Sequence, residues 1–149
     1  ILARLSRLPI LLQQVIDLLE QGIAAGITPP RIAIRSVPQQ ILNQITENPL
    51  ESPLLRAFRQ IPSSIDAKNQ SRLLTEAIAI YDKHVLPSLS NFYTYLTQRY
   101  IPNCRKTIAF SDLPKGQEWY AHKVSCSTTT TLTPAEIHAL GLKEVERIH

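Results

Sequence analysis

The longest regular feature of this 149-residue sequence is an apolar series that repeats every three or four residues between positions 74 and 100. This is the spacing of one face of an α-helix, whereas a strand places alternate side chains on opposite faces. A helix this long needs packing partners along its apolar face, so the series predicts an all-α protein. Its members are Leu74, Ile78, Tyr81, Val85, Leu89, Phe92, Leu96 and Tyr100.

A proline lies inside this long helix. Pro87 has no N–H to donate to the carbonyl of Lys83, so the sequence predicts a kink there. We expect Ser63 or Ser64 to cap the start of the helix, and Ile101-Pro102 to end it.

The tyrosines of this helix alternate with basic residues such as Lys83 and Arg99, a pattern that can also bind single-stranded nucleic acid. Helical periodicity favours the alternative in which these rings belong to the core. We therefore expect no nucleic-acid partner.

Four glycines stand against eleven prolines, which disfavours tight hairpins and favours helices that prolines begin and end. The expected fold is an irregular bundle of about five to seven helices, with one long Pro-kinked helix. Residues 1–149 form a single helical domain or a fragment of a larger helical domain. Besides the long helix, the expected helices cover residues 8–25, 31–45 with a break near Pro38, 52–61, 116–125 and 134 onward.

The last of these helices has a strongly marked start. Thr133 suits the N-cap, Pro134 the first helical position, and Glu136 completes a capping box. An apolar series at Ile137, Leu140, Val145 and Ile148 follows, and no glycine or proline closes the helix before His149. With no methionine in the chain, this indicates an internal piece of a longer protein.

The net charge of +4 comes from 16 basic and 12 acidic residues that are dispersed singly, which favours a solvated surface over a binding patch. No apolar run approaches the roughly 18 residues that span a membrane, so no transmembrane segment is expected. The compartment stays open, and an exported or lipid-anchored parent protein is one alternative.

No metal site is expected from the histidines, because none of the four lies in an H-E-x-x-H pattern. Glu118 and His122 are four residues apart on an expected helix and could hold one ion together. A surface pair between them is the favoured alternative, because two ligands do not complete a site. The four histidines are His84, His122, His138 and His149.

Nucleophile chemistry is the next candidate. Cys126 or Thr128 would need a positioned base, for which His122 and His138 are the nearest histidines. The favoured alternative is that the threonine hydroxyls bind backbone groups between two helices. Cys104 and Cys126 match no zinc or C-x-x-C pattern, and their disulfide state stays open. No catalytic residue is expected in this chain.

Several short pieces follow one another in a fixed order. The longest block is Leu132-Thr133-Pro134-x-Glu136-Ile137-His138-x-Leu140-Gly141-Leu142, followed by Glu144-Val145-x-Arg147-Ile148. The earlier pieces are Leu8-Pro9, Gly26, Pro29-Pro30, Leu86-Pro87, Tyr100-Ile101-Pro102, Leu113-Pro114-x-Gly116, Tyr120 and Thr128-Thr129-Thr130. Over essentially the whole chain this order resembles the bacterial family named domain of unknown function 885.

The resemblance implies a helical segment of a protein related to zinc metallopeptidases of the thermolysin type, whose zinc-binding helix would lie downstream of His149. No zinc ligand or general base of that family maps onto this chain, so zinc is expected only in the parent protein. The segment carries a signature of unknown role. Its residues are Tyr120, Thr128, Thr129, Thr130, Glu136, His138, Gly141, Glu144 and Arg147.

Two departures from the family pattern lie in this signature region. In the family an acidic residue often follows the threonine triplet, and here that position is Thr131. A basic residue is common before the triplet, and here Ser125-Cys126-Ser127 precedes it. These two departures argue against a substrate contact in this region.

Two functions remain compatible with the sequence. The first is a helical scaffold of a zinc metallopeptidase-like protein, catalytically silent by itself, with the remainder of the parent chain as partner and a peptide as the parent's substrate. The second is a freestanding helical module that binds a protein or an acidic partner. An unpaired apolar stripe near Ile137, Leu140 and Ile148 would favour the first.

Overall fold

The computed structural model describes residues 1–149, which form two compact units, Ile1–Lys106 and Thr107–His149. The chain contains no strands, and its only β-type pairing is an isolated bridge between Pro30 and Arg105. The expected all-α class is therefore confirmed. That residues 1–149 form one domain or a fragment of one stays a prediction.

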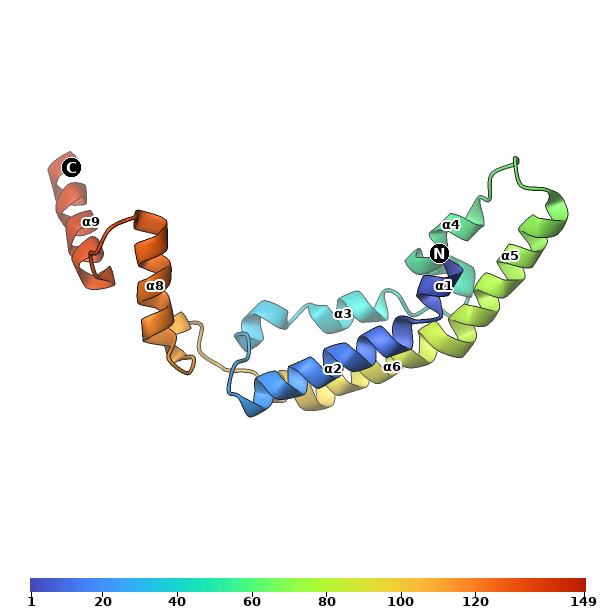
Figure 1. Ribbon diagram of the computed structural model, residues 1–149, viewed down its shortest axis with the longest axis horizontal. Helices are drawn as coiled ribbons and strands as arrows, with labels where there is room; N and C mark the ends of the chain where they lie inside the picture. Colours follow the sequence, from blue (N-terminus) through green and yellow to red (C-terminus); the bar gives the residue numbers. More distant parts are fainter. The chain divides into compact units, whose positions relative to one another are not determined.

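The first unit consists of helices joined by short 3₁₀ turns (Figure 1). Its helices are α1 (Leu2–Leu5), α2 (Leu8–Ala24), α3 (Val37–Leu42), α4 (Arg56–Arg59), α5 (Ala67–Ile80), α6 (Leu86–Tyr95) and α7 (Ile101–Asn103). The 3₁₀ turns are η1 (Arg31–Ile34), η2 (Pro49–Glu51) and η3 (Pro53–Leu55).

The segments α5, α6 and α7 are parts of one bent helix of 37 residues, which confirms the long helix (Figure 1). Its N-cap is Asp66, whose carboxylate accepts the Asn69 N–H at 3.0 Å. The expected caps Ser63 and Ser64 were therefore wrong, because a carboxylate nearer the first turn takes that role.

Two π turns interrupt the long helix, η4 (Tyr81–Val85) and η5 (Leu96–Tyr100), and each directly precedes a Leu-Pro or Ile-Pro pair. The N–H of Leu86, the residue before Pro87, donates to the carbonyl of Tyr81, five residues back. A proline cannot donate to the fourth residue back and its ring crowds that carbonyl, and the wider turn relieves both problems. The distortion expected at Pro87 thus takes the form of a π turn that precedes it.

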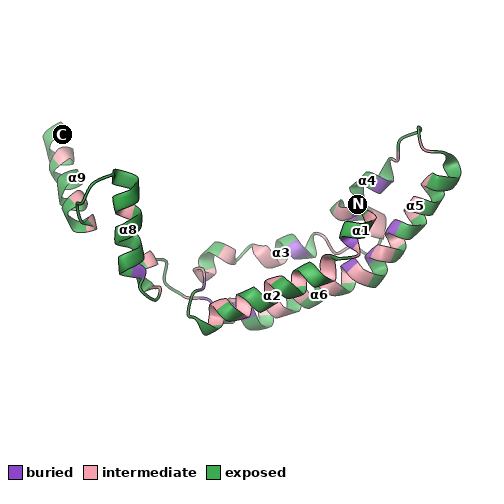
Figure 2. Cartoon of the chain, viewed as in Figure 1, coloured by how far each residue is buried: buried purple, intermediate pink, exposed green.

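The core of the first unit follows one side of this helix (Figure 2). The buried apolar residues of the helix are Ala77, Tyr81, Val85, Leu89, Leu96 and Tyr100, and Cys104 follows them. Leu5, Ile41, Leu55 and Phe58 cover them from α1, α3, η3 and α4. Helix α2 lies alongside α6 and adds partly buried leucines and isoleucines (Figure 1).

Two further helical segments of this unit can be compared with the expected ones. Helix α2 and the following Gly26, whose φ is 68°, confirm the expected first helix and its end. Between residues 31 and 45 the chain forms η1, passes through a turn at Arg35 and Ser36, and resumes as α3 at Val37. The expected break near Pro38 is therefore confirmed, and Pro38 itself lies in the first turn of α3, where a proline loses no hydrogen bond.

The second unit contains the 3₁₀ turn η6 (Phe110–Asp112) and two helices, α8 (Gly116–Thr128) and α9 (Pro134–Ile148). Helix α8 ends three residues later than the sequence indicated, and α9 begins with the expected capping box. Gly116 is the one buried residue of this unit. A side chain there would collide with the carbonyl oxygen of Phe110.

No helix of this protein combines the length and the apolar character that crossing a membrane requires.

Candidate functional site

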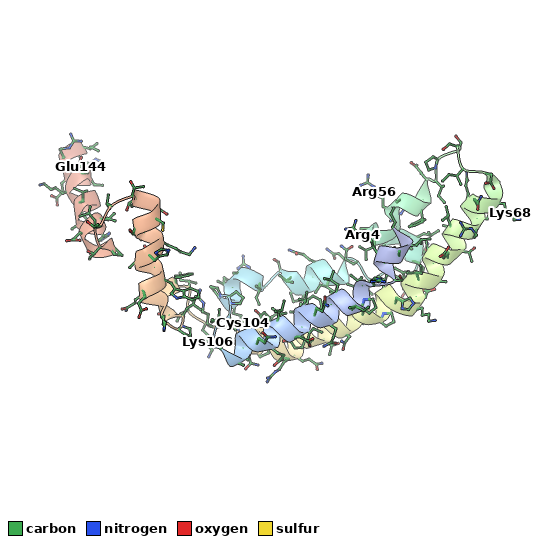
Figure 3. The ribbon with its side chains drawn as sticks, in the orientation of Figure 1. Arg4, Arg56, Lys68, Cys104, Lys106 and Glu144 are labelled. Carbon is green, nitrogen blue, oxygen red and sulfur yellow. The ribbon has the colours of Figure 1, made fainter.

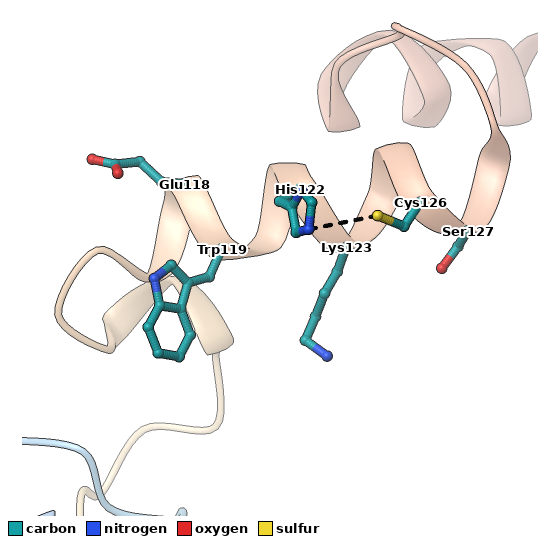
Figure 4. A pocket seen from close by; sticks show the side chains of 6 residues that line it. All are labelled: Glu118, Trp119, His122, Lys123, Cys126 and Ser127. Atoms are coloured by element: carbon teal, nitrogen blue, oxygen red, sulfur yellow. Dashed lines mark hydrogen bonds between the residues drawn. The ribbon is translucent and has the colours of Figure 1, made fainter.

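A pocket of about 570 Å³ lies along α8 (Figure 4). All of its lining side chains come from this one helix, and all but Trp119 are polar or ionisable. They are Glu118, Trp119, His122, Lys123, Cys126 and Ser127.

His122 and Cys126 form the closest pair of reactive side chains in the pocket. The Sγ atom of Cys126 lies 3.6 Å from Nε2 of His122, a contact drawn as a dashed line in Figure 4. The two residues are four apart, and on an α-helix such residues lie one above the other on the same face. Both cysteines of the chain are free thiols; Cys126 is exposed and Cys104 is buried.

This contact was not expected from the sequence. The helix was predicted to end near Ser125, so Cys126 lay just beyond it and the four-residue spacing from His122 predicted no contact. In the structure α8 continues to Thr128, so the four-residue spacing becomes a contact.

The other side chains of the pocket leave this pair accessible. The Lys123 ammonium lies 5.9 Å from the centroid of the Phe110 ring, and that ring lies 6.4 Å from the Trp119 ring. In Figure 4 the Glu118 carboxylate extends away from His122. The surface pair expected between Glu118 and His122 was therefore wrong, because His122 contacts Cys126 instead.

No three or more His, Cys, Asp and Glu side chains come together where they could share a metal ion. The His122–Cys126 pair is thus a two-donor arrangement. The residues present do not fit the closed, four-ligand zinc sites that stabilise folds, or the three-ligand sites that catalyse hydrolysis.

The signature threonines build the end of α8. The Thr128 hydroxyl donates to the carbonyl of Val124 at 2.9 Å and lies 3.0 Å from the Thr130 hydroxyl. The Thr130 hydroxyl accepts the Leu132 N–H at 3.4 Å, and Thr129 adopts the left-handed conformation that ends the helix, with φ 55°. These hydroxyls bind backbone groups between two helices, as we predicted when we favoured this role over that of a nucleophile.

Glu136 belongs to the start of α9. One carboxylate oxygen accepts both the backbone N–H and the hydroxyl of Thr133 at 2.7 Å, and the Thr133 hydroxyl accepts the Glu136 N–H at 3.3 Å. The pKa of Glu136 is lowered mainly by the hydrogen bond from the Thr133 backbone N–H, and further by the hydrogen bond from the Thr133 hydroxyl. The predicted capping box is confirmed.

The remaining signature residues are spread over the unit. Tyr120 lines a second hollow of about 510 Å³ together with Thr128 and Ile137, between α8 and α9. Glu144 and Arg147 form an exposed ion pair of 2.8 Å on α9. His138 and Gly141 are exposed, and a side chain at Gly141 would meet open space. The structure therefore does not bring the signature together in one cleft.

The tyrosines on the long helix are core residues, as expected. Tyr81 and Tyr100 are buried, and Arg99 is bound to Glu20 through two hydrogen bonds of 3.1 and 3.2 Å. Burial, and to a smaller extent the carboxylate of Glu20, raises the pKa of Tyr95 to about 12. The Tyr95 hydroxyl itself forms no hydrogen bond of ordinary geometry.

One further groove, of about 350 Å³, was not expected from the sequence. It lies between α2 and the first π turn, and it is lined by Gln13, Lys83, His84 and Asn91 among others. The π turn brings Lys83 and His84 to its edge, and sequence periodicity alone does not specify a π turn.

Comparisons with known proteins complete these observations. The searches of curated proteins and of solved structures found no match. The model of one family, described as bacterial protein of unknown function (DUF885), matches residues 1–149, which is the full length of the chain. The chain therefore belongs to the DUF885 family.

Proposed function

We propose that this DUF885 chain is a helical scaffold of a zinc metallopeptidase-like protein and forms one wall of its peptide-binding cleft. The observation that carries the proposal is the exposure of apolar side chains in the second unit, where only Gly116 is buried. Trp119 is 47% exposed, Leu142 55% and Ile148 72%.

Such a surface favours a covering partner. Burial of one leucine or isoleucine side chain contributes about 1.5–3 kcal/mol, and monomeric proteins rarely leave large contiguous apolar patches open. On α9 the exposed residues Leu140, Val145 and Ile148 lie on the same face as Ile137, which already lines the hollow against α8. We propose that the remainder of the parent chain continues this packing.

Any zinc in the parent protein would be held elsewhere. The chain has no H-E-x-x-H pattern and no convergent group of three donor side chains. In this proposal the zinc ligands and the general base come from other residues of the parent, and the present chain positions helices without taking part in bond cleavage.

The test compares the protein as its gene encodes it with the 149-residue chain. Elemental analysis and hydrolysis of a peptide library should give zinc and peptidase activity for the former and neither for the latter. Peptidase activity of the 149-residue chain alone, or a gene-encoded protein without zinc and without peptidase activity, would overturn the proposal.

A pair of matched variants examines the role of α9 in the gene-encoded protein. Ile148→Asp places a charge on the exposed apolar face and should lower peptidase activity together with thermal stability. Lys143→Asp, whose side chain lies about 140° around the same helix from Ile148, should change neither. Equal effects of the two variants would contradict a packing role for this face.

The alternative is a freestanding module that binds a protein or an acidic partner, and the net positive charge of the first unit supports it. Residues 1–106 contain twelve of the sixteen basic residues and seven of the twelve acidic ones, a net charge of +5. Polyglutamate should then bind the 149-residue chain, with an affinity that falls as salt is added. Absence of binding at low salt would remove this alternative.

A further inference from the structure

The contact between His122 and Cys126 places an imidazole nitrogen and a thiol sulfur side by side on an exposed helix face. Both are metal-ligating atoms, and neither belongs to the helix cap or to the signature ion pair. We propose that His122 Nε2 and Cys126 Sγ together bind a thiophilic metal ion of low coordination number, with copper(I) as the best match. This proposal is independent of the scaffold function above.

The distance between the two donors suits a shared ion. With the bond lengths of zinc as a guide, about 2.3 Å to sulfur and 2.0–2.1 Å to nitrogen, two donors on one ion lie roughly 3.5 Å apart at a tetrahedral angle and roughly 4.4 Å apart in a line. The observed 3.6 Å lies within this range. Both side chains already lie on the same face of α8, so binding requires only small side-chain rotations.

The number and softness of the donors favour copper(I). Thiolate sulfur selects copper(I) and zinc among the common metals, and imidazole binds both. Zinc sites in proteins ordinarily use three or four protein ligands. Here no third His, Cys, Asp or Glu side chain converges on the pair. Copper(I) forms stable complexes with two or three donors, so this pair and one small external ligand complete its shell.

The surroundings leave room for the ion. The pocket of about 570 Å³ opens beside the pair, and the ammonium of Lys123 lies 5.9 Å from the centroid of the Phe110 ring. Cys104 is the only other thiol; it is 3% exposed and contacts the carbonyl oxygen of Tyr100. Figure 3 shows Cys104 in the first unit. Because Cys104 is buried and Cys126 is exposed, an ion that binds at the surface should select Cys126.

Binding is a ligand exchange without oxidation or reduction. The Cys126 thiol loses its proton to solvent as the sulfur–copper bond forms, and the neutral His122 imidazole donates the lone pair of Nε2. The external ligand that leaves copper(I) is the chelator or thiol that delivers it.

The experiment titrates copper(I) into the reduced 149-residue chain without oxygen, in competition with the coloured chelator bathocuproine disulfonate. We expect one tightly bound copper(I) per chain. Cys126→Ser should abolish this binding, and His122→Ala should weaken it roughly tenfold or more, at least as much as loss of an outer-shell partner does. His138→Ala, at an exposed histidine of α9, is the matched control and should bind like the unchanged protein.

A second measurement reports on the site directly. Bound copper(I) should protect Cys126 from alkylation by iodoacetamide, as read by peptide mass spectrometry, and His122→Ala should reduce that protection. Binding that persists in Cys126→Ser, or alkylation of Cys126 that copper(I) does not slow, would overturn the proposal. So would zinc binding as tight as that of copper(I), because it would contradict a low-coordinate site.

Discussion

Tyr81 joins the long helix to the loop that follows α3. It is completely buried, its hydroxyl donates to the Gln44 carbonyl at 3.0 Å, and it accepts the Thr46 N–H at 3.0 Å. The hydroxyl of Ser52, also fully buried, donates to the same carbonyl at 2.9 Å. One tyrosine thus satisfies the backbone of a segment that has no ladder of its own.

Replacement of Tyr81 by Phe keeps the ring and removes this hydroxyl. The Thr46 N–H loses its partner inside the protein, so the free energy of unfolding should fall by about 1–3 kcal/mol in a urea titration. Tyr93→Phe, on the same long helix, is the control. The Tyr93 hydroxyl makes no hydrogen bond within the protein, so the effect of its removal should stay within about 0.5 kcal/mol. Equal effects would mean that the Tyr81 hydroxyl bonds contribute nothing to stability.

The Glu136 carboxylate makes the start of α9 sensitive to pH. Its pKa is lowered in the folded chain, so its contribution is present above the ordinary glutamate pKa of 4.5 and is lost as the pH falls through the lowered value. The NMR shift of the Thr133 amide should therefore titrate with a midpoint below that of the urea-unfolded chain. A midpoint equal to that of the unfolded chain would contradict the capping box in solution.

At the scale of whole elements, the two π turns keep one face of the long helix on the core. Buried residues recur in steps of four at Ala77, Tyr81, Val85 and Leu89, and again at Leu96, Tyr100 and Cys104. Each step of four exceeds a 3.6-residue turn, so a regular α-helix would rotate such a series off the core. Each π turn absorbs one extra residue and returns the series to the same face.

This explanation predicts where the helix tolerates a deletion. In a Pro87→Ala background, removal of the exposed Lys83 should convert the first π turn into α-helix and keep the flanking core residues in place. Cooperative unfolding should survive, with a change of a few degrees in Tm by circular dichroism.

The matched deletion is Asn91, an exposed residue of the regular helix α6, in the same Pro87→Ala background. It would rotate Phe92 and Leu96 by about 100° from their present face, and large-to-small replacements of such residues already cost about 2–5 kcal/mol each. This variant should lose its cooperative transition. If both deletions had the same effect, the π turns would not set the register of the core.

Some elements of this structure could be predicted from the sequence, and others could not. Apolar periodicity predicted the long helix, and the Thr133–Glu136 pair predicted the start of α9, because both signals act within a few residues. The π turns escaped prediction because steps of three and four were treated alike. The His122–Cys126 contact escaped because the helix was expected to end at Ser125, whereas the Thr128 hydroxyl binds the Val124 carbonyl and the helix continues to Thr128.

At the scale of the molecule, the two units differ in what holds each of them together. All eleven buried apolar residues belong to Ile1–Lys106, whereas Thr107–His149 buries only Gly116 and depends on helix caps, exposed hydrogen bonds and partial apolar contacts. Figure 2 shows the same contrast along the ribbon. Since burial of apolar surface supplies most of the stability of a fold, the second unit should unfold more readily.

The single tryptophan makes this difference measurable. Trp119 lies in the second unit, so its fluorescence follows that unit in a urea titration, while far-UV circular dichroism is dominated by the helices of the first unit. The fluorescence transition should occur at lower urea than the circular dichroism transition, and amides of α8 and α9 should exchange hydrogen faster than those of α5 and α6. Coincident transitions would show that the two units unfold together, and the few buried residues of the second unit would then not limit its stability.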